Sequence, residues 1–244
     1  MRRDLARSRA EAQQLISDSK VLVGGMPTPK PATLVASDTP IELVTDEKRW
    51  VSRGAMKLLS ALESFPVDMS GKRVLDVGSS TGGFTEVALD RGAASVTALD
   101  VGRAQLHERL LRDPRVVSME RTNFRLVDPD RLGDPFPVIV ADLSFISLCA
   151  VAGNLASVAT DGADLILLVK PQFEAGKGRV GHGGVVRDQT VRDEVVTHVI
   201  ECLGAAGLGA RGLVRSPIEG RDGNVEYLLW LRKGEAGLVL EVPA

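Results

Sequence analysis

Four charged side chains stand where a folded sheet would bring them together. Asp142 and Lys170 each end a short apolar stretch that is typical of a buried strand. Ligands of open α/β sheets bind at the carboxyl ends of the strands, so we expect both side chains to face that crevice. Glu226 lies in a later apolar strand and Lys57 precedes the sheet, so two lysines and two carboxylates could form one neutralising cluster. A lysine held in this way can lower the pKa of a substrate hydroxyl or take its proton, whereas a salt-bridge network that only ties loops together is an equal alternative.

A glycine-rich loop is the second feature with chemical meaning. Gly78-Ser-Ser-Thr-Gly-Gly-Phe84 lies between an expected strand and an expected helix, where backbone N–H groups can meet an anionic ligand. Asp100 ends the next strand, 22 positions after Gly78, which suits a carboxylate that accepts the ribose hydroxyls of a nucleoside cofactor. The loop is neither G-x-G-x-x-G nor a Walker A motif, so NAD and ATP are disfavoured and S-adenosylmethionine fits better. A tight turn needed only for packing remains the alternative.

These residues require a sheet that positions them, and the apolar pattern from residue 72 onward predicts one. Strands alternate with helices, which predicts an α/β fold with a parallel sheet covered on both faces. The last two strands are joined only by a loop, so we expect an antiparallel hairpin at one edge. The expected strands are 73–77, 95–100, 116–120, 138–142, 164–170, 211–216 and 225–232, and the expected helices are 84–91, 103–112, 147–159 and 189–206.

The first part of the chain predicts a separate, small α+β unit. A helix at 8–18 with a capping box at Ser8 and Glu11 is followed by short strands at 20–23 and 41–44. We therefore expect a domain at 1–44, a linker at 45–52, a sheet domain at 53–233 and a loose tail at 234–244. Basic residues outnumber acidic ones in the first 57 residues, although the whole chain carries a net charge of −2. This asymmetry is a weak indication of a polyanion partner at one end.

Composition excludes several classes of protein. The 244 residues are 44% hydrophobic and 25% charged, which is typical of a globular protein rather than a disordered one. We find neither an apolar run of the roughly 20 residues that a membrane span needs nor a secretory signal, so we expect a cytoplasmic protein. The three histidines are scattered, so we expect no metal site. Cys149 and Cys202 are the only cysteines, and we expect both in the core of a protein in a reducing compartment.

Seven segments together resemble the TlyA family. The resemblance covers nearly the whole chain, with the segments in the family's order, and is therefore far more specific than a single glycine loop. It implies an rRNA 2′-O-methyltransferase with an FtsJ-like, Rossmann-like domain preceded by a small S4-like RNA-binding domain; some members carry the name hemolysin. The segments begin at Ser52 (SRGAMKL), Gly78 (GSSTGGFT), Glu120 (ERTN), Val140 (VADLSFIS), Val169 (VKPQFE), Gly183 (GGVVRD) and Gly223 (GNVEY).

The resemblance also implies residue roles. The family's Lys-Asp-Lys-Glu tetrad maps onto Lys57, Asp142, Lys170 and Glu226, with Lys170 activating the ribose 2′-OH, Asp142 orienting it and the other two tuning the charge. The expected contacts to S-adenosylmethionine are Gly78, Ser79, Ser80, Thr81, Gly82, Gly83, Phe84, Asp100, Val101, Thr122, Asn123 and Asp142. The expected contacts to rRNA or ribosomal subunits are Arg7, Arg9, Lys20, Lys30 and Arg53. Cytidine is the implied target nucleoside, in small-subunit rRNA, large-subunit rRNA or both.

One departure from the family concerns the start of the chain. Members usually have a further helix ahead of the segment that begins at Leu5, so we expect the first S4 helix to be shortened, with weaker affinity for RNA. Two alternatives remain beside the enzyme: an RNA-binding module without catalysis, and a membrane-active hemolysin. An intact tetrad argues against the first, and the absence of a long lysine-rich amphipathic segment argues against the second.

Overall fold

The chain folds as two units, residues 1–49 and 50–244. The structure, a computed structural model, describes residues 5–6, 8–17, 20–24, 26–27, 30, 32–36, 39–43, 50–176, 178–181, 183–220 and 223–244. The boundary lies inside the segment that we expected to be a linker. Trp50 and Val51 belong to the second unit, because both pack against one of its hydrophobic clusters.

The first unit contains one helix and a small antiparallel sheet. The helix α1 is Arg9–Ser17, and the strands are β1 (Val21–Val23), β2 (Met26–Pro27) and β3 (Ile41–Leu43), in the order β2-β1-β3. The Glu11 N–H donates to Ser8 Oγ at 3.1 Å, so Ser8 caps the helix as its position predicted. No residue of α1 is buried, which fits a unit that is too small for a large core.

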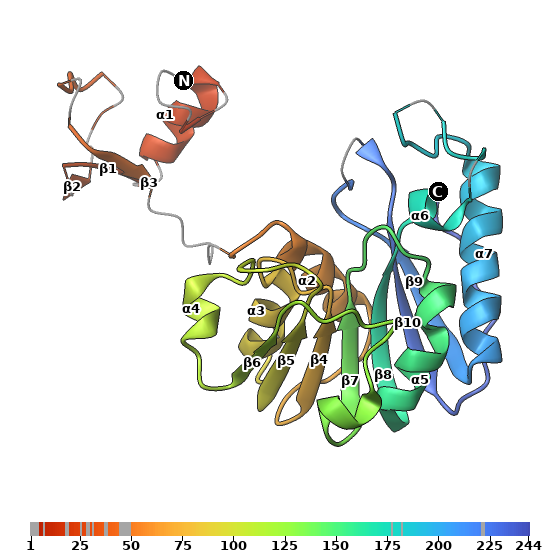
Figure 1. The fold of residues 1–244 in the computed structure, drawn as a ribbon. Coiled ribbons are helices and arrows are strands. Elements are labelled where there is room, and N and C mark those ends of the chain that lie inside the picture. Colours follow the sequence, from red (N-terminus) through yellow and green to blue (C-terminus); the bar gives the residue numbers. More distant parts are fainter. Residues whose placement is uncertain are drawn as a thin grey trace. The chain divides into compact units, whose positions relative to one another are not determined.

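The second unit is built on a seven-stranded sheet (Figure 1). Its strand order is β6-β5-β4-β7-β8-β10-β9. The first five of these run parallel, and β10 pairs antiparallel with both β8 and β9, so the expected C-terminal hairpin forms the edge of the sheet. The strands are β4 (Arg73–Val77), β5 (Ser95–Leu99), β6 (Val116–Met119), β7 (Phe136–Ala141), β8 (Ala159–Val169), β9 (Leu208–Arg215) and β10 (Tyr227–Lys233).

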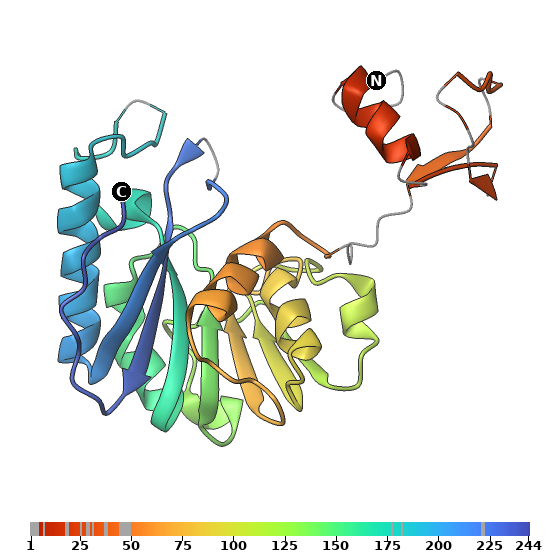
Figure 2. The same ribbon diagram turned by 180° about the vertical axis from the view of Figure 1, so that it is seen from behind.

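Helices cover both faces of this sheet, and alternate residues of each strand explain why. In β8, Leu165 and Leu167 face a cluster that includes residues of α5 and α7, whereas Ile166 and Leu168 face a cluster that includes α2 and α3. Figure 2 shows α2 and α3 on the face turned away from the viewer of Figure 1. The helices are α2 (Gly54–Ser64), α3 (Gly83–Asp90), α4 (Glu108–Leu111), α5 (Ala152–Val158), α6 (Pro171–Glu174) and α7 (Gln189–Ala205), with 3-10 turns η1 (Pro129–Leu132) and η2 (Leu148–Val151).

Two expected helices are shorter than the pattern predicts. The helix expected at 103–112 is reduced to α4, because the Glu120 carboxylate accepts the backbone N–H groups of Ala104 and Gln105 and holds them in a loop. The helix expected at 147–159 is divided into η2 and α5, since Ser147 Oγ caps a tight 3-10 turn first.

We expected the C-terminal segment to be loose, but it packs against the second unit. The Leu238 N–H donates to the Ala210 carbonyl of β9 at 2.8 Å, and Leu240 and Val242 pack against the main hydrophobic cluster. Residues 234–244 therefore lie along the edge strand, where they cover part of its unpaired backbone. Among the residues that the structure describes, no helix has the length and apolar character needed to cross a membrane.

The cysteine expectation was wrong. Cys149 and Cys202 are half-buried, and they form a disulfide that joins η2 to α7. The two residues are 53 positions apart in the chain, and their Cα atoms are 5.8 Å apart. Spacing along the chain gave no signal for this contact, since it depends on where α7 packs.

Candidate active site

The four charged residues of the expected tetrad form two ion pairs. Lys170 Nζ lies 2.5 Å from Asp142 Oδ1, and Lys57 Nζ lies 2.5 Å from Glu226 Oε2. Both lysines are only 8% exposed, a degree of burial that charged residues rarely show unless they are paired. Lys170 Nζ also donates to Ser144 Oγ at 2.9 Å. Adjacent parallel strands place the first pair, because Asp142 follows β7 and Lys170 follows β8.

The second pair is assembled from distant parts of the chain. Lys57 lies on the buried face of α2, where it accompanies Ala55, Leu58 and Ala61. Glu226 immediately precedes β10 and is 2% exposed. A helix and an antiparallel strand therefore supply this pair, rather than two parallel strand ends.

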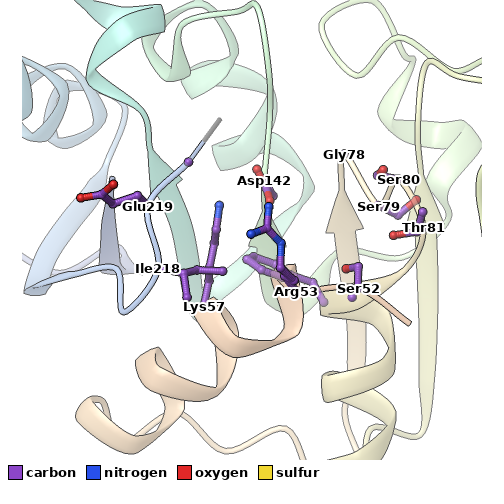
Figure 3. Close-up of a pocket in the computed structure, with 14 residues that line it drawn as sticks. Ser52, Arg53, Lys57, Gly78, Ser79, Ser80, Thr81, Asp142, Ile218 and Glu219 are labelled. Carbon is purple, nitrogen blue, oxygen red and sulfur yellow. The ribbon is translucent and has the colours of Figure 1, made fainter. Parts of the chain in front are cut away.

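A cavity of about 470 Å³ joins the two pairs. Lys57 and Asp142 both line it, so each pair contributes one side chain to its wall. Figure 3 shows Lys57 rising from α2 with Arg53 beside it, while Ser79, Ser80 and Thr81 lie on the other side of Asp142 from Glu219. The cavity is open at the carboxyl end of the sheet, which is where we expected a ligand crevice.

A second cavity of about 460 Å³ adjoins the first. Gly78, Ser80 and Asp142 line both cavities and form their junction. The second cavity is also lined by Asp100, Val101, Thr122 and Asn123, the residues that we expected around the nucleoside part of a cofactor. Strand ends, rather than neighbouring positions in the chain, bring these residues together.

The glycine loop has the conformation that such a ligand site needs. Gly78 has φ +82°, and a Cβ atom there would lie 2.6 Å from the Asp142 carbonyl oxygen, so only glycine allows the loop to approach β7 so closely. Asp100 accepts the Ser80 N–H at 2.8 Å on one oxygen and the Gly102 N–H at 2.7 Å on the other. Each oxygen keeps a further lone pair, so Asp100 can still accept ribose hydroxyls.

The expected cofactor residues do not all line these cavities. Ser79, Thr81, Gly83 and Phe84 line the first cavity, but Gly82 lines neither. Gly82 caps the start of α3 in a left-handed conformation and packs against Leu106 and Leu110. Its role is therefore to begin the helix, a role that the glycine-rich spacing alone cannot distinguish from ligand contact.

Asp76 is a buried carboxyl group within the strand that precedes the loop. It is completely buried and accepts the Thr85 O–H at 2.6 Å, which ties β4 to α3. Burial raises the pKa of Asp76 to about 7, the Thr85 hydrogen bond opposes that rise, and the charge of Asp142 adds to it. The sequence analysis did not single out this residue, because an acid inside an apolar strand has no distinctive spacing.

An aromatic pair, one ring exposed and the other half-buried, lies beside Lys170 and was also missed. Phe145 is 87% exposed and has φ +64°, an unusual conformation for a bulky residue, and it lines the second cavity. Its ring lies 5.0 Å from the ring of Phe173, and Lys170 Nζ is 5.8 Å from the same Phe173 ring. The two phenylalanines follow Asp142 and Lys170 by three positions each, a regularity that the sequence contains.

The expected RNA contacts fall in different parts of the molecule. Arg9, Lys20 and Lys30 lie in the first unit, and Arg9 and Lys30 are exposed. Arg53 lies in the second unit, is exposed and lines the first cavity. Arg7 lies outside the described residues. Among the described residues, no group of three His, Cys, Asp or Glu side chains could hold a metal ion.

Comparisons with known proteins agree with this geometry. The family model of the FtsJ-like methyltransferases matches residues 50–233. The fold and the site therefore define the class of this protein, an FtsJ-like methyltransferase.

Full-length relatives narrow the class further. The chain is 53% identical over 233 residues to the 16S/23S rRNA (cytidine-2′-O)-methyltransferase TlyA of Mycobacterium tuberculosis, which covers 95% of this chain and 87% of that protein. It is 38% identical over 222 residues to Hemolysin A of Brachyspira hyodysenteriae, covering 91% and 92% of the two chains. A solved structure of a Streptococcus thermophilus protein matches with a TM-score of 0.76 and 37% identity, over 96% of this chain and 86% of that one. The chain belongs to the TlyA family.

Proposed function

We propose that this protein transfers a methyl group from S-adenosylmethionine to a ribose 2′-hydroxyl of rRNA, with cytidine as the target nucleoside. The observation that carries the proposal is the Lys170–Asp142 ion pair, in which Asp142 lines both cavities where they meet. One cavity has the residues for a nucleoside cofactor, and the other is open to a second substrate beside Lys57 and Arg53. The activity for which the M. tuberculosis relative is named supports rRNA of both ribosomal subunits as the substrate.

The residues present fit S-adenosylmethionine. Asp100 would accept the ribose hydroxyls, Thr122 and Asn123 would lie at the adenine, and the Gly78–Thr81 backbone would meet the methionine part. When bound, S-adenosylmethionine supplies a methyl group on a positively charged sulfur. The chain's own task is to align the 2′-oxygen with that methyl group, and such alignment accounts for much of the rate of reactions between two bound substrates.

Lys170, as a neutral amine, would receive the proton that the 2′-hydroxyl loses when its oxygen bonds to the methyl carbon. The ammonium formed in this way is the state that pairs with Asp142. Asp142 holds Lys170 Nζ from one side, and Ser144 holds it from another. These two partners therefore fix the position of the nitrogen. Lys57 and Glu226 would tune the charge of the cavity wall, because Lys57 lines the cavity and Glu226 neutralises the charge of Lys57. Phe145 provides an exposed ring at the edge of the site, suited to stacking on a base.

We assign residues 1–44 to an S4-like RNA-binding domain and residues 53–233 to the methyltransferase domain. Arg7, Arg9, Lys20, Lys30 and Arg53 would bind phosphates, which positions the RNA without reading its sequence. An rRNA substrate supports a cytoplasmic location for the reaction.

The test is methyl transfer from labelled S-adenosylmethionine to purified ribosomal subunits, with Lys170→Ala beside the unaltered protein. We expect label in the RNA only with the unaltered protein, and equal binding of S-adenosylmethionine by both proteins. Binding of the cofactor and of RNA without transfer would favour a non-catalytic RNA-binding module. Absence of cofactor binding would contradict the enzymatic proposal altogether.

A further inference from the structure

Two short segments carry the groups that surround the proposed reaction. The first, residues 142–148, follows β7 and contains Asp142, Ser144 and Phe145. The second, residues 170–174, follows β8 and contains Lys170 and Phe173. Three contacts between these groups cross from one segment to the other: Lys170 to Asp142, Lys170 to Ser144, and Phe145 to Phe173. The relative position of the two segments therefore fixes the geometry of the site.

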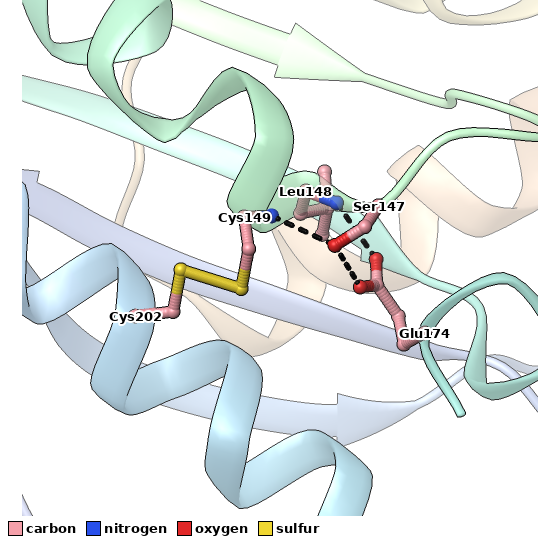
Figure 4. The surroundings of a disulfide bond; sticks show 5 residues. All are labelled: Ser147, Leu148, Cys149, Glu174 and Cys202. Carbon is pink, nitrogen blue, oxygen red and sulfur yellow. Dashed lines mark hydrogen bonds between the residues drawn. A yellow bond between two sulfur atoms is a disulfide. The ribbon is translucent and has the colours of Figure 1, made fainter. Parts of the chain in front are cut away.

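Glu174, at the end of the second segment, binds the end of the first with both carboxylate oxygens. Ser147 Oγ donates to Glu174 Oε2 at 2.5 Å, and the Leu148 N–H donates to Glu174 Oε1 at 2.8 Å (Figure 4). Hydrogen bonds to a charged acceptor are stronger than those between neutral groups. Burial raises the pKa of Glu174, whereas the bonds from Ser147 and Leu148 and the nearby His198 oppose that rise.

The same end of the first segment is held from a second direction. The Cys149 N–H donates to Ser147 Oγ at 3.1 Å, so the Ser147 hydroxyl is bound on both sides. Cys149 is also bonded to Cys202 of α7, which fastens η2 to the helix that covers this face (Figure 4). Glu174 is thus the link that connects this anchored point to the segment bearing Lys170.

We propose that Glu174 is a positioning residue for methyl transfer: by holding Ser147 and Leu148, it fixes Asp142 and Ser144 against Lys170. The proposal rests on the proposed function, because the reaction is what the geometry serves. Glu174 bonds to Ser147 and Leu148, which line neither cavity, whereas the segment that it holds lines the cofactor cavity. Its loss should therefore slow the chemical step much more than it weakens cofactor binding.

The experiment compares Glu174→Gln, Ser147→Ala and the double variant in single-turnover methyl transfer with saturating rRNA and S-adenosylmethionine. Glu194→Gln is the matched control, because Glu194 is a carboxylate of α7 that pairs with Arg179 on the exposed surface. We expect Glu174→Gln to lower the rate about tenfold, while the affinity for S-adenosylmethionine changes by less than about threefold. Both changes affect the Ser147–Glu174 hydrogen bond, so the rate loss of the double variant should be smaller than the product of the two single losses. The proposal would be overturned if Glu174→Gln transferred the methyl group at a rate within about twofold of the control. It would also be overturned if the rate loss of the double variant equalled the product of the two single losses.

Hydrogen exchange of the backbone supplies a readout that does not depend on activity. In Glu174→Gln, the amides of residues 142–148 should exchange faster, while those of residues 78–84 keep their rate. Equal loosening of both segments would indicate a general loss of stability and would overturn the positioning role. An unaltered protein that transfers no methyl group would contradict the proposed function instead, and the exchange result would then decide alone whether Glu174 holds the segment.

Discussion

Lys170 and Lys57 each hold a carboxylate at 2.5 Å, but they do so in different surroundings. Asp142 keeps 24% of its side chain exposed and lines both cavities, whereas the Glu226 side chain is 2% exposed. Asp142 therefore brings the first pair to both cavities, whereas the second pair reaches only the first cavity, through Lys57. The comparison teaches that identical ion pairs can serve separate purposes: one can exchange a proton with a ligand, and the other supports the wall beside it.

The largest expected difference between the pairs concerns the proton. Arginine keeps the positive charge of lysine but does not release its proton in proteins. Lys170→Arg should therefore lower the single-turnover rate by about a thousandfold, and Lys57→Arg by no more than about tenfold. Thermal unfolding of both variants checks that each is folded. Equal losses at the two positions would contradict the division of roles.

The second difference concerns stability. Glu226→Gln leaves Lys57 as a buried charge without its partner, so the free energy of unfolding should fall by about 3 kcal/mol. Asp142→Asn leaves Lys170 with its hydrogen bond to Ser144 Oγ, and the charge that is lost was 24% exposed, so the loss there should be about 1 kcal/mol. Urea denaturation of the two variants measures both values. A larger loss for Asp142→Asn would reverse the comparison.

The third prediction concerns a smaller effect, in which the affinity for the cofactor changes and the rate of methyl transfer does not. Asp100→Asn should weaken the binding of S-adenosylmethionine about tenfold, because a charged acceptor for the ribose hydroxyls is lost. The rate at saturating cofactor should change by less than about threefold, the opposite of the pattern expected for Lys170→Arg. Calorimetric titration and single-turnover kinetics distinguish the two. A rate loss without weaker binding would place Asp100 in the chemical step.

The last prediction concerns the pH dependence of stability and comes from Asp76 rather than from either ion pair. Its pKa in the folded protein is about 7, above the value of 3.8 for an ordinary aspartate, so the folded protein binds a proton more tightly than the unfolded chain. Stability should therefore fall as the pH rises from about 4 to about 7, and the full cost should be present above that range. Asp76→Asn keeps the Thr85 contact without a charge, so it should unfold a few degrees higher than the unaltered protein at about pH 8 and at the same temperature at about pH 4. A difference in melting temperature between the two proteins that is the same at both pH values would contradict this prediction.

The parallel half of the sheet and the site that it carries were largely predictable. Asp142, Lys170 and Asp100 all end apolar strands, and strand ends converge at one edge whatever the details of packing. The antiparallel half was predictable only as a hairpin, because insertion of β10 between β8 and β9 depends on pairings that no local pattern records.

Long-range contacts account for what the sequence did not reveal. Lys57 meets Glu226 across 169 positions, and the helix that carries Lys57 was not expected, because a buried lysine breaks its apolar face. The Glu120 carboxylate accepts two backbone N–H groups and thereby holds the first part of an expected helix in a loop. The role of Gly82 and the Cys149–Cys202 pair depend likewise on which helices pack nearby.

The central claim is that Lys170 receives the proton of a ribose hydroxyl. The most direct measurement is mass spectrometry of nucleosides from rRNA that has been treated with the unaltered protein or with Lys170→Arg. The account predicts 2′-O-methylcytidine with the unaltered protein and none above background with the variant. A methyl group on a base, or equal 2′-O-methylation by both proteins, would contradict it.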